Sequence, residues 1–320
     1  MPIIEYAGKQ YHSEPQESVL DLLLRNGVEV NFGCQAGACQ ACVLKVEEGV
    51  VPQRAQLGLK ETEQQQGYFM ACCCYPEGDL VISNGTSDLQ FSATLVNKRQ
   101  LSSEIVGLTL ATDQPIAYQA GQFINLHHPD GLIRSYSLAS VAALDDKLEL
   151  HVRRIPNGVV SNWLHDQLQL GEQLTLSGPK GDCFYTPGQP EQPLLMIGSG
   201  SGLAPLYGIL RDALLQGHQG PIYLFHGSRE PAGLYLMNEL RVLSGEYEQF
   251  HYTPSLSSEC DDNQIQQGRA LDLALQAHPS LQGYRVYLCG NESMVQQAKK
   301  RTFLAGANMS DIFADPFTIA

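Results

Sequence analysis

Apolar and polar residues alternate over several short stretches of this 320-residue chain and follow a helical period over others. Residues 3–14 alternate about a glycine, which predicts a β-hairpin. Residues 18–27 form an apolar run between a serine cap and a glycine stop, which predicts a short helix. Five more alternating stretches have the spacing of an antiparallel barrel: 91–100, 104–112, 121–128, 134–140 and 147–155. From residue 194 onward, apolar strands are followed by helical patterns, which indicates a doubly wound parallel α/β domain.

The charge balance argues against two classes of binding partner. The chain has 34 acidic and 20 basic residues and a net charge of -14, whereas nucleic acids and anionic membranes bind to basic faces. Residues 1–88 hold 12 of the acids and five of the bases, which suits docking to a basic protein, although surplus surface acid also aids solubility. The first residues show no signal-peptide pattern and no apolar run has the length of a membrane span, so we expect a cytoplasmic protein without membrane contact.

Six of the nine cysteines lie between residues 34 and 74. In the cytoplasm, clustered cysteines bind metals or do redox chemistry more often than they form disulfides. Cys34, Cys39 and Cys42 follow the order C-x4-C-x2-C, and three consecutive cysteines come later at 72–74. Zinc sites usually pair two C-x2-C knuckles, so this spacing favours a plant-type 2Fe–2S cluster over a zinc site or a group of buried free thiols.

This region resembles the plant-type ferredoxins. In that family two residues and then, often, an aromatic–proline pair follow the fourth ligand, and "CCCYP" matches if Cys72 is that ligand. The resemblance implies four cluster ligands: Cys34, Cys39, Cys42 and Cys72. Cys73 and Cys74 would not bind iron, although either could replace Cys72. Together with the hairpin, the helix and a closing strand at 80–83, the pattern predicts a β-grasp domain over residues 1–88.

Three elements of the middle region carry chemistry when taken in order. "RSYS" at 134–137 offers a cation, an aromatic face and hydroxyl groups on one strand. "NGVVSNWL" at 157–164 is a turn that opens a helix at Ser161, and a helix N-terminus can bind phosphate. "SGPKG" at 177–181 indicates a tight turn. Together they resemble the ferredoxin–NADP+ reductase superfamily.

The resemblance implies an FAD-binding antiparallel barrel over residues 89–188. Arg134 would meet the pyrophosphate, Tyr136 would pack on the isoalloxazine, and Ser137 would hydrogen-bond near N5. Gly158 and Ser161 would hold phosphate at the start of the helix. Taken by itself, the Arg-x-Tyr-Ser stretch is also compatible with an edge strand that exposes its arginine.

A glycine-rich turn follows the first apolar strand of the last region. It has the form G-x-G-x-x-P, in which Gly200 and Gly202 would let the backbone approach a pyrophosphate. Pro205 falls in the first helical turn, where proline is tolerated. This form again resembles the reductase superfamily and implies a domain for a nicotinamide nucleotide over residues 189–320.

The same resemblance implies where the adenosine part of the nucleotide binds. Its ribose would meet Ser228, Arg229 and Tyr235. Arg229 could hold the 2′-phosphate of NADPH or stack on adenine, and Glu230 could accept a hydrogen bond from a free 2′-hydroxyl. Oxygenase reductases with this domain order usually use NADH, which favours NADH here.

Two more residues are tied to hydride transfer by the resemblance. Cys289 belongs to a Cys-Gly pair that would lie beside the nicotinamide, so Ser137 and Cys289 are the candidate catalytic residues. A buried core cysteine is the plainer alternative. Phe317 could lie near the flavin, or it could fill a gap in the core.

The whole domain order resembles the reductase component of ring-hydroxylating dioxygenases and related multicomponent oxygenases. It implies that electrons pass from NAD(P)H through FAD and the 2Fe–2S cluster to an oxygenase component. One alternative is a different acceptor, such as a diiron hydroxylase or a deoxysugar dehydratase. Another is a redox sensor that carries the cofactors without turnover. No metal spacing joins the histidines at 127, 128, 151 and 226, and we expect no ligand or base among them.

Overall fold

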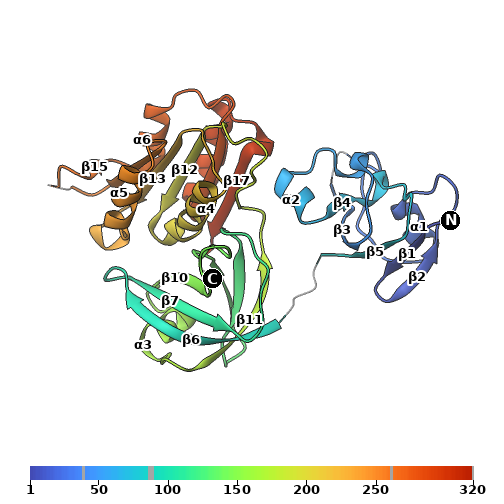
Figure 1. Ribbon diagram of the computed structural model, residues 1–320, viewed down its shortest axis with the longest axis horizontal. Coiled ribbons are helices and arrows are strands. Elements are labelled where there is room, and N and C mark those ends of the chain that lie inside the picture. Colours follow the sequence, from blue (N-terminus) through green and yellow to red (C-terminus); the bar gives the residue numbers. More distant parts are fainter. Residues whose placement is uncertain (38–39, 86–89, 260–261, 319–320) are drawn as a thin grey trace. The chain divides into compact units, whose positions relative to one another are not determined.

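The structure is a computed structural model that describes residues 1–37, 40–85, 90–259 and 262–318. The chain divides into two compact units, Met1–Asp88 and Leu89–Ala320, which Figure 1 shows in blue and in green to red. The first unit holds one sheet and the second holds two. Cys39, one of the expected cluster ligands, lies outside the described residues. In the part of the chain that the structure describes, no helix is long and apolar enough to cross a bilayer.

The first unit is a five-stranded mixed sheet with a helix packed against it. Its strands lie in the order β2-β1-β5-β3-β4, with bounds β1 Ile3–Tyr6, β2 Lys9–His12, β3 Val43–Glu48, β4 Tyr68–Met70 and β5 Leu80–Ser83. The helices are α1 Val19–Arg25 and α2 Glu61–Gln65. The expected hairpin is present, because Ala7 and Gly8 both adopt positive φ between β1 and β2.

The expected first helix is present as well. Ser18 caps α1, and its Oγ accepts a hydrogen bond from the Asp21 amide at 3.1 Å, which satisfies one of the free N–H groups of the first turn. The apolar face of α1 packs into a core that also contains Phe69 from β4 and Cys74. This packing sets the segment that carries the three consecutive cysteines against the helix.

The first sheet of the second unit is antiparallel throughout. Its strands lie in the order β10-β7-β6-β11-β8-β9, with bounds β6 Gln90–Gln100, β7 Ile105–Thr112, β8 Phe123–His127, β9 Ile133–Ser137, β10 Leu148–Arg153 and β11 Gln173–Lys180. A bridge between Leu138 and Leu150 joins the two ends of this order, so the sheet curves back on itself. One helix, α3 Val159–Asp166, follows β10.

One local expectation for this sheet is wrong. The tight turn predicted at 177–181 is instead the end of β11. The pairing of β11 with β8 shifts register between Ser177 and Lys180, so the glycine and proline are accommodated by a bulge and not by a reversal of the chain.

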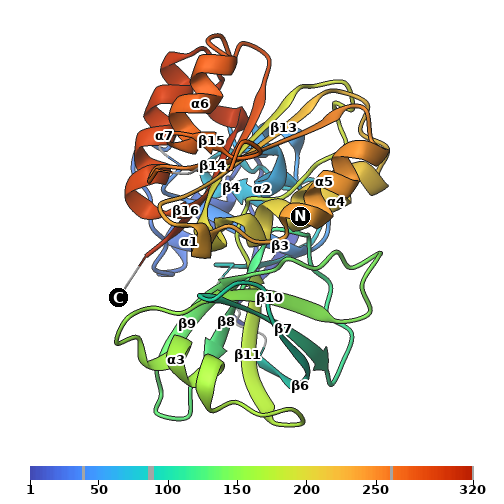
Figure 2. The same cartoon turned by 90° about the vertical axis from the view of Figure 1, so that its left-hand side faces the viewer.

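The second sheet of this unit is parallel and six-stranded. Its strands lie in the order β15-β14-β13-β12-β16-β17, with bounds β12 Leu194–Ser199, β13 Ile222–Ser228, β14 Phe250–Leu256, β15 Gln266–Gln267, β16 Arg285–Asn291 and β17 Ile312–Phe317. The helices are α4 Leu203–Leu215, α5 Met237–Glu246, α6 Ala270–Ala277 and α7 Glu292–Leu304. Figure 2 shows α6 and α7 on one side of this sheet and α4 and α5 on the other.

The strand order places a crevice at a defined point of this sheet. Successive strands run outward from β12 through β13 to β14, and then the chain returns to the other side of β12 to form β16 and β17. In open α/β sheets, ligands bind outside the carboxyl ends of the strands at such a reversal. The hollows of the second unit that are described below lie around this point.

Candidate functional site

The residues expected to bind flavin surround one hollow of the second unit. This large hollow has a volume of about 530 Å³. It is bounded by strand β9, by the start of α3 and by the end of β17. Six expected residues line it: Arg134, Tyr136, Ser137, Gly158, Ser161 and Phe317. Segments that are far apart in the sequence are thus brought to one site.

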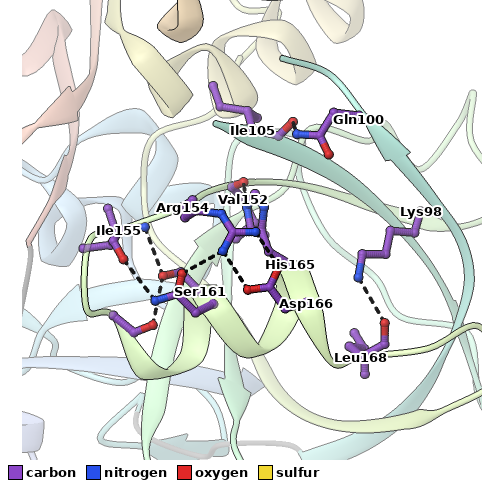
Figure 3. Close-up of polar contacts among 12 residues, drawn as sticks. Lys98, Gln100, Ile105, Val152, Arg154, Ile155, Ser161, His165, Asp166 and Leu168 are labelled. Atoms are coloured by element: carbon purple, nitrogen blue, oxygen red, sulfur yellow. Dashed lines mark hydrogen bonds and ion pairs between the residues drawn. The ribbon is translucent and has the colours of Figure 1, made fainter. Parts of the chain in front are cut away.

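The start of α3 is held in place by side-chain contacts that Figure 3 draws. Ser161 Oγ accepts a hydrogen bond from the Ile155 amide at 3.1 Å. Arg154 forms a two-fold ion pair with Asp166 at 2.6 and 2.7 Å. The helix begins at Val159 and not at Ser161 as expected, because the Ser161 hydroxyl closes the preceding turn from within the helix.

This helix start suits an anion. Gly158 occupies the N-cap, and among the described residues no side chain caps the first turn. The first N–H groups of a helix have no intrahelical partner and carry partial positive charge. Because Gly158, Val159, Val160 and Ser161 all line the large hollow, a phosphate in the hollow could take these hydrogen bonds.

Arg134 and Tyr136 bring a cation and an aromatic ring to the same wall. Arg134 is half-buried, and its Nη1 donates to the Ile133 carbonyl at 2.8 Å. Burial raises the pKa of the Tyr136 phenol, so its ring is neutral at physiological pH. The pair offers a charge for pyrophosphate and a flat surface for a ring system.

We expect Arg134→Ala to purify with less FAD than the wild type. Charge-assisted hydrogen bonds contribute about 1.5–3 kcal/mol, which corresponds to a weakening of FAD binding by about ten- to a hundredfold. The flavin-to-protein ratio after gel filtration measures this. Lys147→Ala, which removes an exposed cation from the same sheet region outside the hollow, is the control. Equal flavin content in both variants would remove Arg134 from the site.

Three segments meet at the floor of the large hollow. Ser137 Oγ donates to Asp315 Oδ2 at 2.5 Å. Asp315 lies opposite Cys289 in the register of β16 and β17, and the Asp315 amide hydrogen-bonds to the Cys289 thiol. Cys289 Sγ lies 3.8 Å from Cys183 Sγ. The two candidate catalytic residues, Ser137 and Cys289, are therefore joined through Asp315.

Cys289 itself is fully buried and lines none of the hollows described here. Burial raises the pKa of its thiol well above the usual range, so Cys289 remains a neutral thiol. Its neighbour Cys183 does line the large hollow. Cys289 is therefore separated from the large hollow by residues that line it, among them Cys183.

Asp315 is the functional candidate that sequence reasoning missed. Burial raises the pKa of this carboxyl from 3.8 to about 6. The hydrogen bond from Ser137 lowers the pKa, and the negative charge of Asp182 raises it further. A carboxyl with such a pKa can hold or release a proton near neutral pH. The signal in the sequence was a lone acid within the apolar terminal stretch "IFADPF".

The glycine-rich turn packs tightly against the same region. Gly200 adopts a φ of +53°, and a Cβ on Gly202 would lie 2.2 Å from the Cys289 carbonyl oxygen. Pro205 is buried in the first turn of α4. His226 Nε2 lies 3.1 Å from the Gly200 carbonyl, and burial lowers the pKa of His226 to about 4, so this histidine is a neutral support for the turn.

We expect Gly202→Ala to impair nucleotide use while the protein keeps its flavin. The new methyl group must push the turn away from β16, and close backbone approach to a pyrophosphate is then lost. The KM for the nucleotide should rise about tenfold or more, measured with ferricyanide as acceptor. Gly245→Ala, where a Cβ would meet nothing within 4 Å, is the control. An unchanged KM in Gly202→Ala would show that the turn does not contact the nucleotide.

Two further hollows continue from the large one. A middle hollow of about 440 Å³ is lined by Ser199, Gly200, Ser228 and Arg229, and it shares Arg153 and Phe317 with the large hollow. A distal hollow of about 280 Å³ also contains Ser228 and Arg229 in its lining. These two expected residues thus lie where two hollows adjoin.

Tyr235 is not brought to these hollows. It is only 2% exposed and lines none of the three. Its hydroxyl lies 3.1 Å from His151 Nδ1, and His151 Nε2 lies 3.3 Å from Glu149. Tyr235 joins the nucleotide side of the unit to the antiparallel sheet, and a direct contact with the nucleotide stays a prediction.

In the first unit, three of the four expected cluster ligands are described. Cys42 and Cys72 are buried and hydrogen-bonded to one another, and burial raises the pKa of Cys42 to about 11. Cys34 is exposed on the loop before them. Cys39 lies outside the described residues. Among the residues that are described, no group of three histidine, cysteine, aspartate or glutamate side chains is close enough to hold a metal ion.

Backbone amides of this loop point at the sulfur atoms. The Ala36 amide donates to Cys34 Sγ at 3.4 Å, and the Gly37 amide hydrogen-bonds to the Cys72 sulfur. Such amides offset the negative charge of thiolates around an iron–sulfur cluster. The loop thus has the donors that an anionic cluster needs.

The three consecutive cysteines have three different surroundings. Cys72 faces Cys42, as above. Cys73 Sγ lies 3.8 Å from Cys72 Sγ, beside Gly37. Cys74 is fully buried in the core, and its thiol pKa is raised to about 12 by that burial. The assignment of Cys72 as the fourth ligand stays a prediction, with Cys73 as the nearer substitute.

These arrangements fit the groups that the sequence implies. The large hollow joins a cation, an aromatic wall and a free helix start, as FAD requires. The glycine turn and the residues Ser228 and Arg229 fit a nicotinamide nucleotide. The sulfur-facing amides and the Cys42–Cys72 pair fit a 2Fe–2S cluster.

Comparison with known proteins identifies the same three parts. In chain order, family models match a 2Fe-2S iron-sulfur cluster binding domain over residues 4–77, an oxidoreductase FAD-binding domain over residues 92–185 and an oxidoreductase NAD-binding domain over residues 196–300. The chain is 31% identical over 333 residues to the phenol hydroxylase P5 protein of Acinetobacter pittii (strain PHEA-2), covering 99% of this chain and 94% of the relative.

Two further similarities extend over nearly the whole chain. It is 33% identical over 311 residues to the aromatic O-demethylase reductase subunit of Amycolatopsis sp. (strain ATCC 39116 / 75iv2), covering 93% of this chain and 92% of the relative. The solved structure of the Amycolatopsis cytochrome P450 reductase GcoB matches with a TM-score of 0.71 and 31% identity, covering 100% of this chain and 99% of that one.

The cofactors and the enzyme class follow from these matches. The chain is an oxidoreductase with domains for a 2Fe–2S cluster, FAD and a nicotinamide nucleotide. The family resemblance expected from the motifs is confirmed, as is electron transfer from NAD(P)H as the activity. The chain belongs to the family of the oxygenase reductase components, in which a ferredoxin domain, an FAD-binding domain and a nicotinamide-nucleotide domain follow one another.

Proposed function

We propose that this protein moves electrons from NAD(P)H through FAD and the 2Fe–2S cluster to an oxygenase component. The observation that carries the proposal is the junction of Ser137, Asp315 and Cys289. This junction lies under the large hollow and against the glycine turn. A nicotinamide bound at the turn and a flavin bound in the hollow would meet there.

The cofactors determine the order of the path. When bound, a nicotinamide supplies a hydride, a flavin takes two electrons together and releases them singly, and a 2Fe–2S cluster takes one at a time. The chain supplies position and protons. Ser137 and Asp315 hold a proton beside the reacting atoms, and the Cys289 thiol packs behind them.

Binding is assigned to separate groups. Arg134 and the start of α3 hold the FAD phosphates, while Tyr136 and Phe317 cover its ring system. Gly200, Gly202 and Pro205 shape the turn that holds the nucleotide pyrophosphate, and Ser228 and Arg229 meet its adenosine half. Four cysteines hold the cluster: Cys34, Cys39, Cys42 and Cys72.

We also propose a finer architecture than the sheets alone define. The mixed sheet with α1 is assigned as a β-grasp, the antiparallel sheet as a closed barrel, and the parallel sheet as a doubly wound domain. The three domains would span residues 1–88, 89–188 and 189–320. The bridge between Leu138 and Leu150 supports closure of the barrel, and the reversal of strand order at β12 supports double winding.

The acceptor is proposed to be an oxygenase component that acts on an aromatic compound. The relatives named for phenol hydroxylase and for aromatic O-demethylation support this class, and the surplus of acid in residues 1–88 suits a basic docking face. A cytoplasmic location stays a prediction from the sequence. A diiron hydroxylase or a deoxysugar dehydratase is the alternative acceptor, and reconstitution with each partner would separate them.

Anaerobic stopped-flow spectroscopy of the purified protein tests the proposal. After mixing with NADH or NADPH, we expect the flavin absorbance to bleach first and the cluster bands to bleach next. Flavin bleaching alone would show that the cluster is absent or disconnected. No bleaching with either nucleotide would contradict the reductase function and favour a redox sensor, and steady ferricyanide reduction would argue against a sensor.

A further inference from the structure

One face of β16 carries three buried side chains that contact the same stretch of chain. Arg285, Tyr287 and Cys289 alternate along this strand, and alternate residues of a strand point to the same face. The residues between them pack in a separate core together with α6 and α7. The stretch that the three side chains contact lies within residues 181–186, called here the linking segment.

The linking segment joins the two sheets of the second unit. It follows β11 of the antiparallel sheet, and the chain enters β12 of the parallel sheet at Leu194. Its first three residues, Gly181, Asp182 and Cys183, line the large hollow. A Cβ on Gly121 would lie 2.5 Å from the Cys183 carbonyl oxygen, so the turn before β8 packs tightly against this end. One end of the linking segment is therefore part of the hollow that fits FAD.

The other end of the linking segment is held by β16. Arg285 Nη1 donates to the Thr186 carbonyl at 3.0 Å and also to the Thr186 hydroxyl. The Tyr287 hydroxyl donates to the Phe184 carbonyl at 3.4 Å. The thiol contact described above is the third. As β16 advances, its contacts move back along the linking segment from residue 186 to residue 183, so the two stretches run side by side in opposite directions.

Arg285 places a positive charge where burial makes a charge costly. It is only 3% exposed, and its Nε lies 3.7 Å from Asp311 Oδ1. Its guanidinium lies 5.7 Å from the centre of the Phe313 ring, and it also hydrogen-bonds the Tyr287 hydroxyl. A buried charge costs free energy even in an ion pair, and an apolar side chain could fill the same volume. What an apolar side chain would lack is the pair of directed hydrogen bonds to Thr186.

We propose that Arg285 and Tyr287 are positioning residues for hydride transfer, because they clamp the linking segment to the strand that carries Cys289. This inference rests on the proposed function. The glycine turn packs against the Cys289 carbonyl, and the linking segment lines the flavin hollow, so the clamp sets the distance between the two cofactors. Reacting atoms must approach to about 3–3.5 Å, and a misplacement of about 1 Å can slow a reaction about a hundredfold.

Anaerobic stopped-flow measurement of flavin bleaching at several nucleotide concentrations tests the clamp. We expect the limiting rate to fall about tenfold or more in Arg285→Lys and about threefold or more in Tyr287→Phe. The dissociation constant of the nucleotide should stay within about twofold of the wild type. Lysine keeps the charge but lacks the planar fork of donors. When deuterium replaces the transferred hydrogen, the isotope effect on the slowed step should be at least as large as in the wild type.

Two control substitutions remove the same chemical groups from other places. Tyr284→Phe removes a hydroxyl that lies 3.3 Å from His278 Nδ1, and Tyr284 packs against the separate core on the α6 and α7 side. Thr302→Val removes a buried hydroxyl that donates to the Ala298 carbonyl at 2.8 Å. Both controls should keep the wild-type rate. Thr186→Val, which removes the hydroxyl that Arg285 contacts, should slow flavin bleaching about threefold or more.

Hydrogen exchange measured by mass spectrometry on the flavin-loaded protein gives a readout without turnover. The amides of the linking segment should exchange faster in Tyr287→Phe and Thr186→Val than in the wild type and the two controls. Tyr287→Phe keeps the ring that stacks on Phe313, so it tests the clamp even where Arg285→Lys does not fold. A lower melting temperature and flavin content, with an unchanged rate in the flavin-loaded molecules, would show a role in stability alone and overturn the inference.

Failure of this inference is distinct from failure of the proposed function. Wild-type rates in Arg285→Lys and Tyr287→Phe, beside normal flavin reduction in the wild type, would overturn the inference and leave the function intact. No flavin reduction in the wild type with either nucleotide would contradict the function, and with it the role of the clamp in hydride transfer. Faster exchange in the variants would then assign the clamp to structure alone.

Discussion

A Cys72→Ser variant is expected to purify with FAD but without its 2Fe–2S cluster. Cys72 is the buried sulfur that contacts Cys42 and receives the Gly37 amide, and four cysteine thiolates hold a cluster of this type, so we expect its loss when one thiolate is removed. Cys72→Ala removes any chance that a serine oxygen replaces the sulfur. Iron and sulfide content and the electron paramagnetic resonance spectrum of the reduced protein measure the loss.

The electron path should break at one defined step in this variant. Ferricyanide reduction depends on flavin alone and should persist, whereas reduction of cytochrome c, which accepts single electrons from the cluster, should be lost. Cys74→Ser is the matched control, because Cys74 is the neighbouring cysteine that is fully buried in the core. A retained cluster in Cys72→Ala would move the fourth ligand to Cys73, whose sulfur is 3.8 Å away.

An Asp315→Asn variant is expected to reduce its flavin about a hundredfold more slowly while binding nucleotide normally. General acids and bases contribute about 10²- to 10⁴-fold to rates, and Asp315 is the buried carboxyl bonded to Ser137. The measurement is the rate of flavin bleaching at saturating nucleotide in the stopped-flow instrument. Asp113→Asn, an exposed carboxylate outside the large hollow, should leave the rate unchanged.

The pH dependence of this rate should change as well. Hydride transfer by itself would give the reduced flavin a negative charge, and one proton would then neutralise it. A protonated Asp315 would supply that proton through Ser137 and would be left as a carboxylate. Because the pKa of Asp315 is raised to about 6, the wild-type rate should fall as pH rises through about 6. In Asp315→Asn this step in the profile should be absent. A wild-type profile that is flat between about pH 5 and 8 would exclude Asp315 as the donor.

The Asp315→Asn substitution should change stability in the opposite direction to the rate. The raised pKa means that the folded protein binds this proton more tightly than the unfolded chain, so the stabilisation is complete below about pH 4 and is lost as pH rises through about 6. A shift of about two pKa units corresponds to about 3 kcal/mol. Asp315→Asn should therefore melt at a higher temperature than the wild type at pH 8 and at a similar temperature at pH 4. A variant that is slower but more stable marks Asp315 as functional and not structural.

Local patterns were sufficient to predict most elements of this fold. The β1–β2 hairpin and the capped helix α1 depend on residues within a few positions of one another, such as Ala7, Gly8 and Ser18. Where the tertiary environment overrides a local signal, the prediction was wrong. The glycine and proline of 177–181 indicate a turn by themselves, but pairing with β8 extends β11 through them.

The sequence by itself determined the three-part organisation and most of the cofactor chemistry of this protein. Cysteine spacing, the "RSYS" strand and the glycine turn are short motifs, because each holds one part of a cofactor with residues close together in the chain. The tertiary structure alone decided which distant groups act together. Asp315 meets Ser137 across 178 positions of the chain, and Arg229, Arg269 and Arg301 face one hollow from three separate elements. Such sites depend on the order of strands in a sheet and on the packing of helices upon it, which no local pattern encodes.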